Sequence, residues 1–176
     1  GDGLEYTASS SALKKGNSVQ LVGFGTFKNQ GSGAVYIWNQ LDGPFRFSAS
    51  RCRFDDNAAY GSFLDDDSDD DCDMVMDECG ASGNGLGGFL EEFVASASAK
   101  KACRKARCTA TANAGPGMVV LDARASFVGC SAEDNAGDGY AVVGRALVLD
   151  ACSSLHNDGN GYVYLAGVVL CRAADE

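Results

Sequence analysis

Two stretches of the chain, CSAEDNAGDGY at Cys130–Tyr140 and CSSLHNDGNGY at Cys152–Tyr162, begin 22 residues apart and share residues at fixed offsets. Cysteine, asparagine, two glycines and tyrosine keep the same offsets in both, whereas most of the residues between them differ. Agreement at fixed offsets indicates a structural unit that the chain repeats.

The same spacing recurs through most of the chain. A cysteine lies five residues before an asparagine in five copies, and in an earlier copy Phe24 takes the place of the cysteine before Asn29. Each asparagine is followed by a glycine-rich or small step and an apolar run, and a short alternating run precedes each cysteine. Runs of about four to six residues are typical of strands, and no helical pattern accompanies them.

A unit of this size cannot bury its own apolar face, so each copy must stack on the next. Short strands in such a stack predict an all-β coil, a parallel β-helix, in which equal positions of successive rungs lie about 4.8 Å apart. We expect residues 1–17 to form an N-terminal cap or lead-in and residues 18–176 to form the repeats.

Stacking explains why asparagine and cysteine keep their positions. Asparagine tolerates the left-handed backbone of a sharp corner, and stacked amides can hydrogen-bond to one another as a ladder. Cysteine acts as a small hydrophobic side chain, and parallel side chains in adjacent rungs leave the Cβ atoms slightly too far apart for a disulfide. The expected ladder is Asn29, Asn57, Asn84, Asn113, Asn135 and Asn157, and the expected column of free thiols is Cys52, Cys79, Cys108, Cys130 and Cys152.

Two copies exceed 22 residues because each contains an insertion. The first, residues 65–78, is acidic, and the second, residues 91–107, ends in a basic stretch. We expect both to leave the same edge of the coil as loops, one rung apart. Because Cys72 and Cys103 lie in these neighbouring loops, they are candidates for a disulfide, which would indicate an oxidising compartment.

The acidic insertion offers a candidate calcium site, because carboxylate oxygens on a flexible loop suit Ca²⁺. The alternative is a solvated acidic loop, since the insertion lacks the spacing of an EF-hand. No other cofactor is expected. The candidate ligands are Asp65, Asp66, Asp67, Asp69, Asp70 and Asp71.

The basic stretch offers a candidate partner-binding surface. Its cations can neutralise the acidic loop of the same molecule, or they can meet the acidic loop of another molecule, since complementary charge favours association. The sequence is consistent with both alternatives. The candidate residues are Lys100, Lys101, Arg104, Lys105 and Arg107.

Two short motifs carry a resemblance to a known group. FDDN at Phe54–Asn57 and GGFL at Gly87–Leu90 match a Phe-x-x-Asn motif and a Gly-Gly-Ala-apolar motif, with Phe in place of Ala in the second. The units thus resemble right-handed parallel β-helix repeats, above all those of polymorphic outer-membrane proteins, over residues 19–173. The resemblance implies a right-handed solenoid of about six rungs, which surface adhesins and structural exoproteins share with pectin-lyase-like polysaccharide enzymes.

The composition argues against nucleic-acid binding and against a membrane span. ALKKGNSVQLVGFGTF at Ala12–Phe27 resembles part of the HU family of DNA-bending proteins, but no basic arm follows it and the net charge is −10. Nucleic-acid affinity comes largely from cations that neutralise phosphates, so no nucleic-acid binding is expected. The chain has no run of about 18 apolar residues, so no membrane-spanning helix is predicted.

No catalytic set is recognisable. His156, the only histidine, is expected at an exposed corner, four rungs from Asp55 and Asp56. We therefore expect a non-enzymatic structural or adhesive module, extracellular or at the cell surface, that joins protein partners or copies of itself in a larger assembly. The alternative is a carbohydrate-binding or polysaccharide-cleaving, pectin-lyase-like coil that holds a glycan. Its candidate lining residues are Tyr36, Trp38, Tyr60 and Tyr164.

Overall fold

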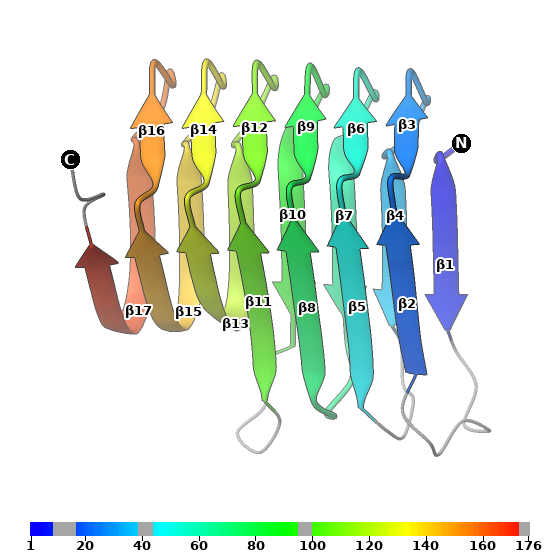
Figure 1. Cartoon of the computed structure of the whole chain (residues 1–176), viewed down its shortest axis with the longest axis horizontal. Helices are drawn as coiled ribbons and strands as arrows, with labels where there is room; N and C mark the ends of the chain where they lie inside the picture. Colours follow the sequence, from blue (N-terminus) through cyan, green and yellow to red (C-terminus); the bar gives the residue numbers. More distant parts are fainter. Residues whose placement is uncertain (9–16, 39–43, 95–99, 173–176) are drawn as a thin grey trace.

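The computed structural model describes residues 1–8, 17–38, 44–94 and 100–172. All regular secondary structure in these ranges is β-strand, arranged in three rows of parallel strands (Figure 1). A strand of the first row is followed along the chain by one of the second and one of the third, and the chain then returns to the first. We call one such set of three a layer.

The first and second rows belong to one sheet. The first row contains β1 (Leu4–Ala8), β4 (Ala34–Trp38), β7 (Tyr60–Asp66) and β10 (Gly87–Phe93), and the second contains β2 (Asn17–Val22), β5 (Phe45–Ser50), β8 (Cys72–Asp77) and β11 (Lys101–Ala106). The longer strands β13 (Met118–Val128), β15 (Tyr140–Asp150) and β17 (Tyr162–Arg172) run through both rows. β13 therefore pairs with β10 through its first residues and with β11 through its last.

The third row is a separate sheet of three-residue strands. It contains β3 (Gly25–Phe27), β6 (Arg53–Asp55), β9 (Gly80–Ser82), β12 (Thr109–Thr111), β14 (Ser131–Glu133) and β16 (Ser153–Leu155). Each strand pairs in parallel with its counterpart in the next layer, so equal repeat positions lie over one another.

The core lies between the rows. Side chains of a strand point alternately to its two faces, and in β5 this alternation buries Phe45, Phe47 and Ala49 while Arg46 is exposed. In β8 it buries Cys72, Met74 and Met76 in the same way. The inward side chains of successive layers form one continuous hydrophobic cluster.

The asparagines form a ladder along the third row. At each of the five steps from Asn29 to Asn157, the backbone N–H and Nδ2 of one asparagine donate to Oδ1 of the next, with side-chain bonds of 2.8–2.9 Å. The four inner asparagines are at most 1% exposed. Each amide therefore replaces, inside the stack, the hydrogen bonds that water would otherwise make.

The expectation that asparagine itself adopts the left-handed conformation is wrong. The bend falls one residue earlier, where Lys28, Asp56, Gly83, Ala112, Asp134 and His156 have φ of 52–66°. The asparagine must point inward to reach its neighbour, so the preceding residue turns the chain. A second left-handed corner precedes Phe24 and each of the five cysteines of the column, at Gly23, Arg51, Glu78, Arg107, Gly129 and Ala151.

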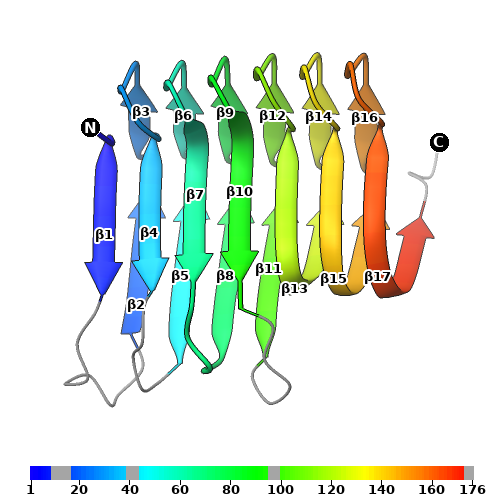
Figure 2. The same ribbon diagram turned by 180° about the vertical axis from the view of Figure 1, so that it is seen from behind.

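The two expected insertions are not single loops. β7 continues to Asp66 and Cys72–Asp77 forms β8, so that residues 67–71 alone link these strands; Lys101–Ala106 likewise forms β11. The runs CDMVMD and KACRKA bury every second side chain, which makes them strands despite their charge. The link between β7 and β8 joins the first row to the second along one side of the molecule (Figure 2), and residues 95–99, between β10 and β11, lie outside the described residues.

The expected N-terminal cap or lead-in contains a strand. β1 pairs in parallel with β4, from Leu4 opposite Ala34 to Ala8 opposite Trp38. Residues 4–8 thus extend the first row by one strand, and residues 9–16 lie outside the described residues.

Candidate functional site

The acidic and basic segments meet on the outer surface of the second row. Arg104 Nη2 donates to Asp73 Oδ2 at 2.6 Å, and Arg107 donates to Asp77 at 2.7 Å and to Glu78 at 3.2 Å. These arginines are more than half exposed, so each pair contributes about 0–1 kcal/mol to stability. Of the two alternatives that the sequence allows, the structure shows neutralisation within one molecule.

One ion pair lies in the interior, where β7 ends and β11 begins. Lys101 Nζ donates to Asp66 Oδ2 at 2.6 Å, to the Ser68 carbonyl at 2.8 Å and to the Ser68 hydroxyl at 3.1 Å. Asp66 Oδ1 accepts from the backbone N–H and the hydroxyl of Ser68. All three ammonium protons have acceptors, and both charged side chains are at most 1% exposed. The pair is therefore fully hydrogen-bonded.

A second buried ion pair is less completely satisfied. Lys105 Nζ donates to Glu91 Oε2 and lies 3.4 Å from Cys103 Sγ, between the rings of Phe89 and Phe127 at 5.4 and 5.7 Å. Glu91 Oε1 is buried and has no hydrogen-bond partner among the described residues. Burial raises the pKa of Glu91, and attraction by Lys105 offsets only part of that rise.

The expected partner-binding set is therefore divided. Lys101 and Lys105 are buried and bonded inside the chain, so neither can meet a partner. Arg104 and Arg107 are exposed but engage carboxylates of their own molecule. Lys100 is exposed, and its backbone N–H donates to Asp71 at 2.7 Å. The interpretation of these five residues as one partner-binding surface is wrong.

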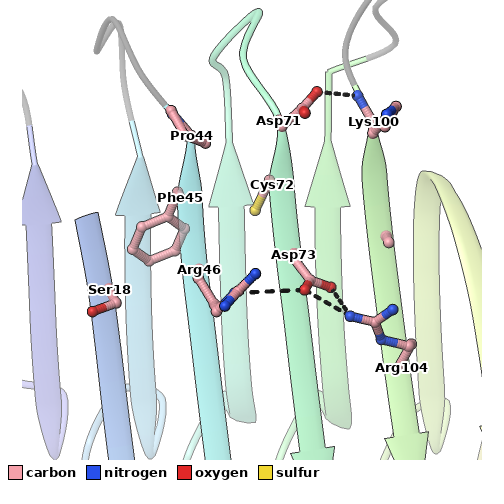
Figure 3. Close-up of a pocket in the computed structure, with 10 residues that line it drawn as sticks. Ser18, Pro44, Phe45, Arg46, Asp71, Cys72, Asp73, Lys100 and Arg104 are labelled. Atoms are coloured by element: carbon pink, nitrogen blue, oxygen red, sulfur yellow. Dashed lines mark hydrogen bonds and ion pairs between the residues drawn. The ribbon is translucent and has the colours of Figure 1, made fainter. Parts of the chain in front are cut away.

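An open groove of about 470 Å³ lies over β5, β8 and β11 near the links (Figure 3). Its floor carries a row of charges in which Asp73 lies between Arg104 and Arg46, the latter with Nε 3.7 Å from the carboxylate. Asp73 is thus neutralised from both sides, and the arginines at the two ends of the row are exposed. The charges of the groove hold the acidic and basic segments against each other, and these described residues do not form a catalytic arrangement.

The candidate calcium ligands do not converge. Asp66 is buried and bonded to Lys101, whereas Asp65 lies partly exposed on the other face of β7. Burial, followed by repulsion from Asp67, raises the pKa of Asp65. Within the ranges that the structure describes, no group of three or more His, Cys, Asp or Glu side chains could hold a metal ion. The calcium expectation thus has no site in these residues.

The expected disulfide is also wrong. Cys72 lies opposite Lys101 and Cys103 lies opposite Met74, two residues further along paired strands. A two-residue offset separates the Cα atoms by about 8 Å, and a disulfide needs less than about 7 Å. Both thiols are free and buried, and burial raises the pKa of Cys103 to about 12. The inference of an oxidising compartment from this bridge therefore loses its basis.

The five cysteines of the column are free thiols. Cys52, Cys79, Cys108 and Cys130 are buried, and Cys152 is partly exposed in the last layer that the structure describes. The carbonyl groups of the four buried cysteines join successive layers by hydrogen bonds. The column is thus continuous from one layer to the next.

Neither the histidine nor the aromatic residues form a catalytic or glycan site in the described part of the chain. His156 is exposed, with Nδ1 3.7 Å from Asp134 at a corner. Tyr60 stacks on Phe63 at 6.1 Å, and Tyr164 is exposed on β17, at another part of the molecule. The side chains of Tyr36 and Trp38 lie outside the described residues.

Sequence reasoning missed Glu91 and Ser68, which complete the two buried ion pairs. A signal was present in KACRKA, because a strand there places Lys101, Cys103 and Lys105 on one face. Alternation in FLEEF likewise puts Glu91 on the same face as Phe89 and Phe93. The cluster of charges obscured this alternation.

No protein family model matches the chain, and neither a curated protein nor a solved structure is significantly similar to it. In the residues that the structure describes, no helix has the length and apolar character needed to cross a membrane.

Proposed function

We propose that the chain is a non-enzymatic structural module, a right-handed parallel β-helix that stacks end to end on a second copy of itself. The observation that carries the proposal is the exposed apolar surface of β17. Tyr164 and Tyr162, whose partners in β15 point inward, are 52% and 38% exposed there. Monomeric proteins rarely present an apolar strand with an open hydrogen-bonding edge, because it is a template for further pairing.

Comparison with the preceding layer supports this reading of β17. Val142 and Tyr140 in β15 are 1% exposed, whereas Tyr164 and Tyr162, which pair with them in β17, are 52% and 38% exposed. The difference arises because one more layer covers β15. A further layer on β17 would bury the same positions.

The opposite end of the stack supplies a matching surface. Leu4 in β1 holds the repeat position that Tyr162 holds in β17, through the pairs that connect β1 with β17. Leu4, Val19 and Phe24 pack only partly against the core. A second copy placed there continues the parallel register, which makes a head-to-tail contact of the kind that propagates.

The resemblance to surface repeat proteins supports an extracellular or cell-surface location as part of this proposal. The absence of a convergent catalytic or aromatic set among the described residues supports a structural role over the carbohydrate alternative.

The test compares two neighbouring residues of β17. Tyr164 pairs with the inward Val142 and Leu165 with the outward Val143, so stacking would cover Tyr164 and leave Leu165 at the surface. Sedimentation over a range of concentrations should show association of the wild type. Tyr164→Glu should weaken it at least about tenfold, because the contact would bury an unpaired carboxylate.

Leu165→Glu is the control, since it adds the same charge at an exposed site, and its association should match the wild type. Circular dichroism checks that both variants fold. A wild type that stays monomeric at all concentrations, or equal weakening by both substitutions, would overturn the proposal.

A further inference from the structure

Five cysteines occupy one repeat position and lie over one another. The carbonyl oxygens of Cys52, Cys79, Cys108 and Cys130 each accept a hydrogen bond of 2.9–3.0 Å from the residue that follows the cysteine of the next layer. Paired strands lie about 4.8 Å apart. The sulfur atoms of this column therefore repeat at about one strand spacing.

The thiols have no strong hydrogen-bond partner. Each donates to the carbonyl group two residues earlier at 3.4–3.6 Å, and a thiol is a weak donor. Neighbouring thiols also act on one another. The Cys108 thiol lowers the pKa of Cys79 to about 7, while hydrogen bonding to Cys130 raises that of Cys108. The column is a line of soft donors that repeats at about one strand spacing.

We propose that this thiol column binds soft monovalent d¹⁰ metal ions of the Cu(I) and Ag(I) class, each held in line between two successive sulfurs. Two metal–thiolate bonds of about 2.3 Å span about 4.6 Å. That length is close to the spacing of about 4.8 Å between paired strands. The site thus needs almost no movement of the backbone.

The geometry selects the kind of metal. Zinc requires about four ligands in a tetrahedron, and no such group exists among the described residues. Soft thiolates favour Cu(I)-class ions, which accept two ligands in line. The side chains point inward across the stacking direction, so a metal between two sulfurs meets each at an ordinary angle to its carbon–sulfur bond.

The charges balance inside the core. One ion between two thiols gives a thiolate–metal–thiolate unit of charge −1 and releases two protons. A thiolate sulfur does not bridge two metals that lie in line on either side of it, so the five sulfurs of the column hold two ions, which replace four protons. Each thiolate–metal–thiolate unit carries a single negative charge, which limits the cost of burial.

The column is accessible from one end. Cys152 is partly exposed beside β17, whereas at the other end Phe24 takes the repeat position, its carbonyl accepting from Arg53 N–H at 2.9 Å. Ions enter, and protons leave, past Cys152. Cys72 and Cys103 lie in other inward positions, and Cys171 is exposed.

The experiment titrates the reduced full chain with Ag(I), and with Cu(I) without oxygen, and counts bound ions by native mass spectrometry. A Cys171→Ser background removes the exposed thiol. Two ions are expected. Cys79→Ala should leave one, because Cys52 then has no neighbouring thiol and the other three sulfurs of the column hold a single ion.

The matched control is Cys103→Ala, which removes a buried thiol outside the column and should still bind two ions. X-ray absorption should show two sulfurs per metal. No binding, equal losses in both variants, or a shell of three or four sulfurs would overturn the proposal.

A second measurement needs no substitution in the column. Alkylation of the folded protein, mapped on peptides, should show that Ag(I) protects Cys152 and Cys130 while Cys72 is unaffected. Equal protection of Cys72, or loss of the β-sheet signal in circular dichroism on binding, would contradict the assignment.

Discussion

The layers of β7/β8 and β10/β11 differ from those of β13, β15 and β17 in both continuity and interior. In the former, a link separates the first-row strand from the second-row strand, and the inward positions include Asp66, Glu91, Lys101 and Lys105. In the latter, one 11-residue strand runs through both rows, and the inward positions are apolar. The two kinds of layer nevertheless pair in register with one another.

The comparison shows where the repeat tolerates extra residues and buried charge. Asp66 ends β7, and Lys101 begins β11 of the following layer, which lets these side chains meet. In β13 the corresponding bend is made by a register shift around Asp122, whose φ is 60°, and needs no link. Among the described residues, a charged side chain is buried only where an oppositely charged side chain lies beside it.

The largest effect is expected inside the interrupted layers. Lys101→Met leaves Asp66 buried without its counter-ion and should lower the free energy of unfolding by about 3–5 kcal/mol in chemical denaturation. Lys100→Met removes the adjacent, exposed ammonium and should change it by less than about 0.5 kcal/mol. Similar losses of unfolding free energy in both variants would contradict the expectation that the buried ammonium contributes more to stability than the exposed one.

A smaller effect should separate an inner layer from the last described one. A methyl group on Gly117 would lie 2.8 Å from the Gly139 carbonyl oxygen, whereas on Gly161 its nearest neighbour is Ser154, at 3.4 Å. Thermal unfolding should show that Gly117→Ala costs about 1–3 kcal/mol, while Gly161→Ala is tolerated. If both are tolerated, the inner layers are less closely packed than the structure shows.

The stability that the buried Glu91–Lys105 pair contributes should depend on pH. The pKa of Glu91 is raised by burial, so its stabilising contribution is complete below the unfolded value, near 4.5, and is lost as pH rises through the folded value. The free energy of unfolding of the wild type relative to Glu91→Gln should therefore increase on acidification from about pH 7. A decrease would mean that Lys105 outweighs burial at this site.

The smallest effect is expected for the outer ion pairs. Asp73→Asn removes the carboxylate shared by Arg46 and Arg104, and its cost should be about 0–1 kcal/mol and should shrink as salt is added. Denaturation at low and high ionic strength measures it. A salt-independent loss above that range would place this pair among the buried ones.

Much of the strand arrangement could be predicted from spacing. Cysteine and asparagine keep a five-residue separation because equal positions lie over one another in parallel strands, and the ladder from Asn29 to Asn157 follows from that. The strands of the charged segments were missed, since Lys101 and Lys105 in KACRKA suggested solvent exposure. The left-handed corners before the cysteines were missed as well, because Arg51 and Ala151 have no intrinsic preference for positive φ.

The sequence by itself determined the repeat length, the all-β character and the positions that stack, since these depend on local pattern and periodicity. Only the tertiary structure decided which charges are inside and what neutralises them. Lys101 meets Asp66 across 35 residues of chain, and Lys105 meets Glu91 across 14. The desolvation of a charged group depends on what surrounds it rather than on the group itself, so only the packing of the strands determines which charges are buried.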